Sequence, residues 1–226
     1  MKKSQEKDRI NNILYNDRIE EEIRWRSEKR NNTDNLLINK LVSEIKLLGY
    51  NYNYLADLTM REINDISILK IIQKYIGKFE DEGKSAVLVA VIGKKGNIDA
   101  TETIIYNFNK LNDIRRLAVF YDNALARIQD KRYISEYLKW LSIPEVAYKL
   151  PFTMKMLGKW KVNEAKDIFI KYLSFDRNNE LIYISIAALS FYKDEELFSH
   201  IKNMENHPNI DVKKFVNGIL KKNNKI

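Results

Sequence analysis

The sequence contains no cysteine, and its 226 residues include only three prolines, seven glycines and two histidines. Without cysteine the chain can form no disulfide and no Cys-ligated zinc site, and it has no thiolate nucleophile. So few prolines and glycines leave little room for the many turns of an all-β protein. The first 30 residues contain no apolar core of a secretory signal, and no run approaches the roughly 18 apolar residues of a membrane span. We therefore expect an all-α, cytoplasmic protein that does not associate with a membrane.

What the sequence does contain is a pattern that recurs about every 32 residues in its second half. Four leucines mark it at intervals of 32, 32 and 31 residues: Leu125, Leu157, Leu189 and Leu220. Other large apolar residues recur with the same period, as Phe120 and Phe152 do. A repeat of this length is typical of an α-solenoid, whose units bury a shared core only by stacking on one another.

Each unit is expected to hold two helices. The first helices are predicted at 134–141, 164–173 and 195–204, and the second helices at 145–160, 179–192 and 210–221. A further second helix is predicted at 114–128, where apolar residues form one stripe at i, i+3, i+4, i+7 spacing. Upstream helices are predicted at 35–48, 67–79, 84–94 and 101–110.

Two segments allow more than one interpretation. The β-branched run 85–92 could be a buried strand, but we expect a helix because helices flank it and no second strand is there to pair with it. Pro151 lies inside the helix predicted at 145–160. It should either kink that helix or mark its true start, because proline lacks the backbone N–H.

We predict one continuous repeat domain over 31–226, preceded by a helical cap or extension at 1–30 that shields the first repeat. The approximate repeats are 67–95, 100–129, 131–161, 163–193 and 195–222.

One run carries a family resemblance. It extends from Asp113-Ile-Arg-Arg-Leu-Ala118 through Asn123-Ala-Leu-Ala126 to Asp130, and Asp211-Val-Lys-Lys-Phe215 echoes its start. In this run the chain resembles bacterial HEAT-repeat proteins, and the similarity extends over about two thirds of its length. The other two units lack the Asp-then-basic pattern. The resemblance implies a right-handed α-solenoid of stacked antiparallel helix pairs. It implies no single activity, because such families include adaptors, transport receptors, inhibitors, immunity proteins and some enzymes.

The formal net charge is +8, and the excess is concentrated in residues 131–175, which carry nine Lys and Arg against four Asp and Glu. A basic patch of this kind suits an acidic protein partner or the phosphates of a nucleic acid. A generic solvated surface rich in lysine would give the same count.

In solenoids of this type the second helices line the concave face, which is the usual binding surface. Eight residues off the buried stripes are our candidates for binding: Arg115, Arg116, Asn123, Arg127, Tyr148, Lys155, Lys159 and Tyr183. Stacking by 32 residues would align Asn123 with Lys155 and Arg127 with Lys159. Such a groove of basic and aromatic groups suits carboxylates. The simpler alternative is that Arg115 or Arg116 pairs with Asp113 or Asp122 to tie adjacent repeats together.

No catalytic or metal-binding motif stands out. His200 and His207 are separated by a predicted loop, and there is no HExxH, Gly-x-Ser-x-Gly or phosphate-cradling glycine motif. The one enzyme class to weigh is the HEAT-like alkylpurine DNA glycosylases, which use a basic concave face with tryptophans and an aspartate. The chain has Trp25, Trp140 and Trp160, but no adjacent Trp-Trp pair, and the last two occupy positions that are apolar in other units.

We therefore expect a non-enzymatic scaffold with no metal and no cofactor. It would bind a protein through its concave face, as an adaptor or as an immunity-type inhibitor. The alternative is nucleic-acid binding through the basic groove, including glycosylase activity.

Overall fold

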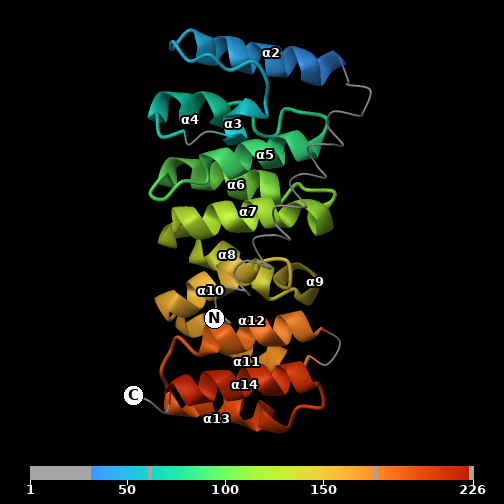
Figure 1. The fold of residues 1–226 in the computed structure, drawn as a ribbon, viewed down its shortest axis with the longest axis vertical. Coiled ribbons are helices and arrows are strands. Elements are labelled where there is room, and N and C mark those ends of the chain that lie inside the picture. The colour runs from blue at the N-terminus through green and yellow to red at the C-terminus, as the bar shows by residue number, and fades with distance from the viewer. Residues whose placement is uncertain (1–31, 61–62, 176–177, 224–226) are drawn as a thin grey trace. The chain divides into compact units, whose positions relative to one another are not determined.

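The computed structural model describes residues 32–60, 63–175 and 178–223 (Figure 1). Helix is the only regular secondary structure in these residues. It accounts for 73% of them, in 13 α-helices and short 3-10 turns, and they contain no strand. The all-α prediction is confirmed. The predicted cap at 1–30 lies outside the described residues. No helix within the described ranges combines the length and the apolar composition needed to cross a membrane.

The chain divides into two compact units, unit 1 (Met1–Ile92) and unit 2 (Gly93–Ile226). The described helices of unit 1 are α2 (Asn32–Lys46), α3 (Asp57–Met60), α4 (Ile66–Gln73) and α5 (Glu82–Ile92). Those of unit 2 are α6 (Thr101–Phe108), α7 (Ile114–Ile128), α8 (Ile134–Leu141), α9 (Pro144–Ala147), α10 (Pro151–Trp160), α11 (Asn163–Leu173), α12 (Asn179–Leu189), α13 (Glu195–Asn203) and α14 (Ile210–Asn223). Short 3-10 turns precede α6 and α8 and follow α13. One continuous domain over 31–226 stays a prediction.

In unit 1, α4 packs on both α2 and α5, and α3 packs on α5. The run 85–92 is helical, as expected, and nearly all of its side chains are buried. A buried carboxylate ties α2 to the turn before α5: Asp34 accepts the backbone N–H groups of Glu80 and Asp81 at 2.9 and 3.3 Å. The Nζ atom of Lys84 lies 2.6 Å from the same carboxylate. The predicted helix 67–79 is shorter than expected and ends at Gln73.

In unit 2, the helices predicted as second members of pairs pack successively on one another, α7 on α10, α10 on α12 and α12 on α14. The predicted first members do the same, α8 on α11 and α11 on α13. Within pairs, α6 packs on α7, α11 on α12 and α13 on α14. The predicted bounds of α7 and α8 are confirmed at both ends.

The backbone of unit 2 repeats with the period of the sequence. Gln129, Lys161 and Lys193 adopt left-handed conformations with φ of 62°, 56° and 54°, and they lie 32 residues apart. Each follows one of the second helices α7, α10 and α12. A left-handed residue satisfies the last carbonyl groups of a helix and turns the chain. Gln129 and Lys161 are the C-cap residues that end α7 and α10, whereas Lys193 lies four residues beyond the end of α12, in the loop before α13.

Polar contacts between successive pairs keep a similar spacing. Each is a hydrogen bond between residues 30 or 31 positions apart in the sequence. The donors and acceptors are Trp140 Nε1 to Asn109 Oδ1, Thr153 N–H to Asp122, Tyr172 OH to the Leu141 carbonyl, and Tyr192 OH to the Val162 carbonyl.

The prediction of one helix over 145–160 is wrong. The chain leaves helical geometry between α9 and α10, and Pro151 is the first residue of α10. Leu150 has φ −117° and ψ 48°, outside the helical region. This follows from the proline ring, which disfavours helical geometry in the residue before it and clashes with the carbonyl four residues back. Pro151 thus marks the true start of a helix, which was one of its two expected roles.

Candidate binding surface

Three helices that pack against one another carry most of the predicted binding residues. Arg115, Arg116, Asn123 and Arg127 lie on α7, Lys155 and Lys159 on α10, Tyr183 on α12, and Tyr148 in the turn after α9. Since α10 packs on both α7 and α12, the fold brings these segments together. The break between α9 and α10 removes Tyr148 from the helix that bears the two lysines.

Four of the eight residues, all cations, are exposed to solvent: Arg115, Arg127, Lys155 and Lys159. The other four are partly buried. Lys155 and Lys159 are four residues apart and share one face of α10. The opposite face of this helix buries Met154 and Leu157. The amphipathic pattern of α10 thus directs both lysines to solvent.

The arginine at position 116 is engaged within its own helix. Its Nε atom lies 3.2 Å from Oδ2 of Asp113, and the other carboxylate oxygen of Asp113 accepts the Arg116 backbone N–H at 3.1 Å. Asp113 therefore caps α7 and holds Arg116 in the first turn. This pair stabilises the start of one helix and does not bridge two repeats.

The aromatic candidates contact neighbours outside the predicted set. Tyr183 packs edge-on against Phe215 of α14, with ring centroids 5.3 Å apart. Lys149 Nζ lies 4.6 Å from the ring centroid of Tyr148. Lys159 Nζ lies 5.8 Å from the ring centroid of Phe191, just beyond α12, and so reaches across the contact between α10 and α12.

A buried aspartate that the sequence singled out only as a potential arginine partner has a structural role. Asp122 of α7 is fully buried, and its two carboxylate oxygens accept the backbone N–H groups of Phe152 and Thr153, both at 2.8 Å. These are first-turn donors of α10, whose own N-cap residue, Leu150, has no side chain that can cap. Burial raises the pKa of Asp122 to about 7, although both N–H groups favour the charged carboxylate.

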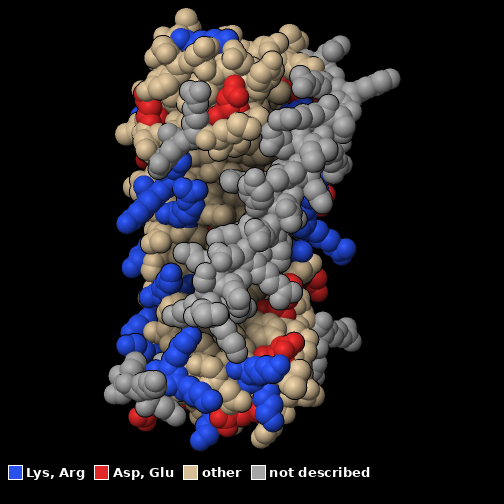
Figure 2. All heavy atoms as spheres, in the orientation of Figure 1, with Lys and Arg blue, Asp and Glu red and all other residues tan. Residues whose placement is uncertain are grey.

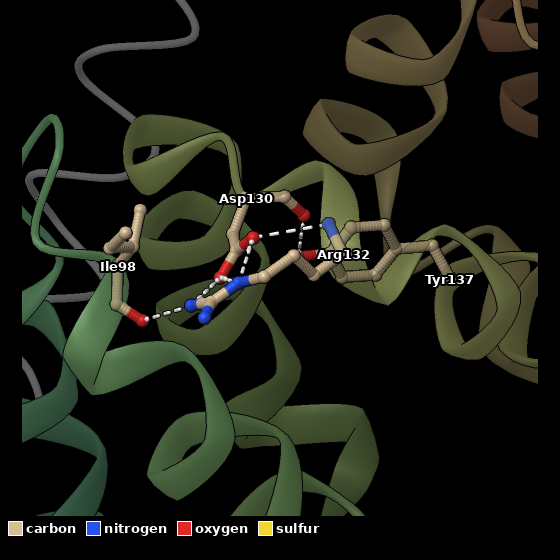
Figure 3. A network of polar contacts seen from close by, with 4 residues as sticks. All are labelled: Ile98, Asp130, Arg132 and Tyr137. Atoms are coloured by element: carbon tan, nitrogen blue, oxygen red, sulfur yellow. Dashed lines mark hydrogen bonds and ion pairs between the residues drawn. The ribbon is translucent and has the colours of Figure 1, made fainter.

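The aspartate of the HEAT-like run, Asp130, belongs to a closed polar network (Figure 3). Arg132 donates to its carboxylate from Nε at 3.0 Å and from a terminal nitrogen at 2.7 Å, and that nitrogen also donates to the Ile98 carbonyl at 3.1 Å. Tyr137 OH donates to the Asp130 carbonyl at 3.3 Å. The bonds from Arg132 hold the pKa of Asp130 below its usual value. Asp130 therefore braces the turn between α7 and α8.

The residues weighed for metal binding or base chemistry are dispersed. Within the described ranges no group of three His, Cys, Asp or Glu side chains is placed to hold a metal ion. His200 lies on α13, and His207 follows the next turn and accepts the Asn209 N–H through Nδ1. Trp140 is buried and donates to Asn109, whereas Trp160 is partly buried beneath Lys131.

In the space-filling view, Lys and Arg side chains gather at the left edge of the lower half, where Figure 1 draws α10, and charges of both signs lie toward the C-terminal helices (Figure 2). Compared with known proteins, the chain matches no family model and no curated protein sequence.

Proposed function

We propose that the chain is a right-handed, HEAT-like α-solenoid that binds another protein through the face formed by its second helices, as an adaptor or an inhibitor, without catalysing a reaction. The observation that carries the proposal is the successive packing of α7, α10, α12 and α14. A row of this kind presents equivalent residues of neighbouring repeats side by side, which is how solenoids build extended binding surfaces.

Two further observations support the solenoid. The left-handed turns after α7, α10 and α12 recur every 32 residues. The polar contacts between pairs span 30 or 31 residues, so each unit is joined to the next one along the chain. Nearest-neighbour contacts of constant spacing are what distinguishes a stack of repeats from a helical bundle.

Two exposed cations without an ion-pair partner among the described residues support a binding role for this face. Arg127 and Lys155 are exposed, and neither forms an ion pair with any residue that the structure describes. Arg116, by contrast, is satisfied by Asp113 and is the weakest of the basic candidates.

The test is affinity purification of the full chain from an extract of its source cells, with and without nuclease treatment, followed by mass spectrometry. A stoichiometric protein that survives nuclease is the expected result. Recovery of nucleic acid, or of proteins lost on nuclease treatment, would instead favour the nucleic-acid alternative. A DNA glycosylase assay would then be the next step.

A further inference from the structure

The solvent-facing sides of α7 and α10 carry the same pattern of side chains. Each helix has a phenylalanine, a polar residue three positions later and a basic residue seven positions later. Residues at this spacing lie on the same side of a helix. We name the six residues the Phe-cation face: Phe120, Asn123 and Arg127 of α7, and Phe152, Lys155 and Lys159 of α10. The two sets are related by 32 residues, and the phenylalanines are partly exposed.

We propose that the Phe-cation face binds an acidic protein segment that also carries apolar side chains, whose carboxylates pair with Arg127, Lys155 and Lys159. This proposal rests on the proposed function and names the chemistry of its partner.

The charge on this face is of one sign. Between Glu145 and Glu164 the sequence contains four lysines and no Asp or Glu. Arg127 and Lys155 have no ion-pair partner among the described residues, and the contact seen for Lys159 is with the Phe191 ring. Carboxylates of a partner would supply the missing counter-charges, and Arg127 can hold one through two parallel hydrogen bonds.

The apolar part of the face favours a protein over a nucleic acid. Phe120 and Phe152 give it partly exposed rings, and Ile184 of α12 and Phe191, just beyond α12, occupy the corresponding positions of the next unit. From Asn179 to Leu189, α12 contributes no Lys or Arg, so the row of cations on α7 and α10 does not continue onto α12. Affinity for a duplex grows with the number of phosphates that Lys and Arg neutralise, and this face supplies only Arg127, Lys155 and Lys159.

The face is held in a fixed arrangement by its supports. The carboxylate of Asp122 accepts the N–H of Phe152 at 2.8 Å and so fixes the start of α10 against the middle of α7. On the other side, a Cβ atom at Gly158 would lie 2.5 Å from the Ala188 carbonyl oxygen, which shows how closely α10 approaches α12. Because the helices that carry these side chains are already fixed against one another, binding loses less conformational entropy from the backbone.

The test uses the full-length protein to select from a displayed library of random peptides, followed by fluorescence titration of the enriched peptides. We expect these peptides to be rich in Asp, Glu and large apolar residues. Lys155→Glu with Lys159→Glu should weaken their binding about tenfold or more, and the neutral pair Lys155→Gln with Lys159→Gln should weaken it less. A matched reversal at exposed sites on α13 and α14, Lys202→Glu with Lys213→Glu, should leave binding unchanged.

The possible outcomes distinguish an acidic partner, another protein partner and a nucleic acid. Acidic peptides that lose affinity only with the α10 reversal support the proposal. Specific peptides that are neutral or basic, or that bind the α10 variant equally well, overturn the acidic partner while leaving protein binding intact. The third outcome is that no peptide is selected, while a short DNA duplex binds the protein and the α10 reversal abolishes that binding. This result overturns both this proposal and the proposed function. Circular dichroism melting of each variant checks that the fold is retained.

Discussion

Unit 1 and unit 2 each contain a fully buried aspartate that accepts hydrogen bonds from a distant stretch of backbone, yet the pKa values of these two aspartates, Asp34 and Asp122, move in opposite directions. Asp34 and Asp122 are both fully buried, and each accepts two backbone N–H groups of a distant segment. Asp34 also has Lys84, whose Nζ lies 2.6 Å away. Burial alone would raise the pKa of Asp34, but the bonds from Lys84 and from the backbone hold it below its usual value. Burial raises that of Asp122 to about 7.

The difference shows that the hydrogen-bonding role and the charge of a buried carboxylate are decided separately. Two N–H donors are enough to make each aspartate a clamp between segments. Whether the clamp is an ion near neutral pH depends on a nearby cation and on how deeply the carboxylate lies in the protein, because a desolvated charge without a partner is costly and Asp122 is the more deeply desolvated of the two. The following substitutions test this contrast.

The largest effect is expected where an ion would be left behind. Asp34→Ala removes the partner of Lys84 and the acceptor for Glu80 and Asp81, and it should lower the free energy of unfolding by about 3–5 kcal/mol. Urea denaturation would measure it. Asp34→Ala with Lys84→Met leaves no unpaired charge and should recover part of the loss. A double variant no more stable than Asp34→Ala would contradict this account.

The pH dependence of stability should separate the two aspartates. An ordinary Asp titrates at 3.8, so the folded state, with Asp122 at about 7, binds the proton more tightly. The contribution of Asp122 to the free energy of unfolding should therefore fall by up to about 4 kcal/mol as pH rises from about 4 to about 7, and then level off. Asp34, whose pKa is lowered, contributes stability above about pH 4 that is lost on further acidification.

Urea denaturation between about pH 3 and pH 8 would measure both contributions against matched variants. Asp122→Asn should abolish the decline in the free energy of unfolding between pH 4 and pH 7, and it should leave the loss of stability below pH 4 unchanged. Asp34→Asn should reduce the loss below pH 4 and leave the decline between pH 4 and pH 7 unchanged. If the Asp122→Asn profile runs parallel to wild type through the neutral range, the raised pKa is wrong.

Removing the clamp of unit 2 should have a smaller effect than removing that of unit 1. Near pH 5, where Asp122 is largely neutral, Asp122→Ala should lower the free energy of unfolding by about 2–4 kcal/mol, because two buried N–H groups of α10 lose their acceptor. Asp122→Asn keeps one acceptor oxygen and should lose less than half as much. Chemical denaturation of the two variants side by side would show this order, and equal losses would refute the capping role.

The two units also differ in how much of them could be predicted. In unit 2 the apolar stripe of 114–128 predicted both ends of α7, since helix spacing and capping are local properties of the chain. The single helix predicted over 145–160 is wrong because Pro151 begins a new helix there, and the conformational limits of proline outweigh the helical pattern of the neighbouring units. In unit 1, without a clear period, the helix predicted over 67–79 extends six residues past Gln73, the last residue of α4.

Some features of the candidate binding surface could likewise be predicted from the sequence, and others could not. The exposure of Arg127, Lys155 and Lys159 follows from their places off the buried stripes, and the Asp113–Arg116 pair could be read from its i, i+3 spacing. The role of Asp122 could not, because the N–H groups that it accepts lie about 30 residues away and capping rules consider only neighbours in sequence. Its place within the apolar stripe, four residues after Ala118, was the available signal.

The smallest effect tests the 32-residue period itself. Lys161 ends α10 with φ 56°, where its Cβ atom crowds the backbone, so Lys161→Gly should raise the free energy of unfolding by about 0.5–1 kcal/mol. Gln129→Gly and Lys193→Gly should stabilise by a similar amount, because the same left-handed conformation recurs there. Lys171→Gly, at an exposed position inside α11, is the matched control and should lower stability by about 1 kcal/mol. Thermal melts of the four variants would decide, and opposite signs among the three turn positions would mean that the turns are not structural equivalents.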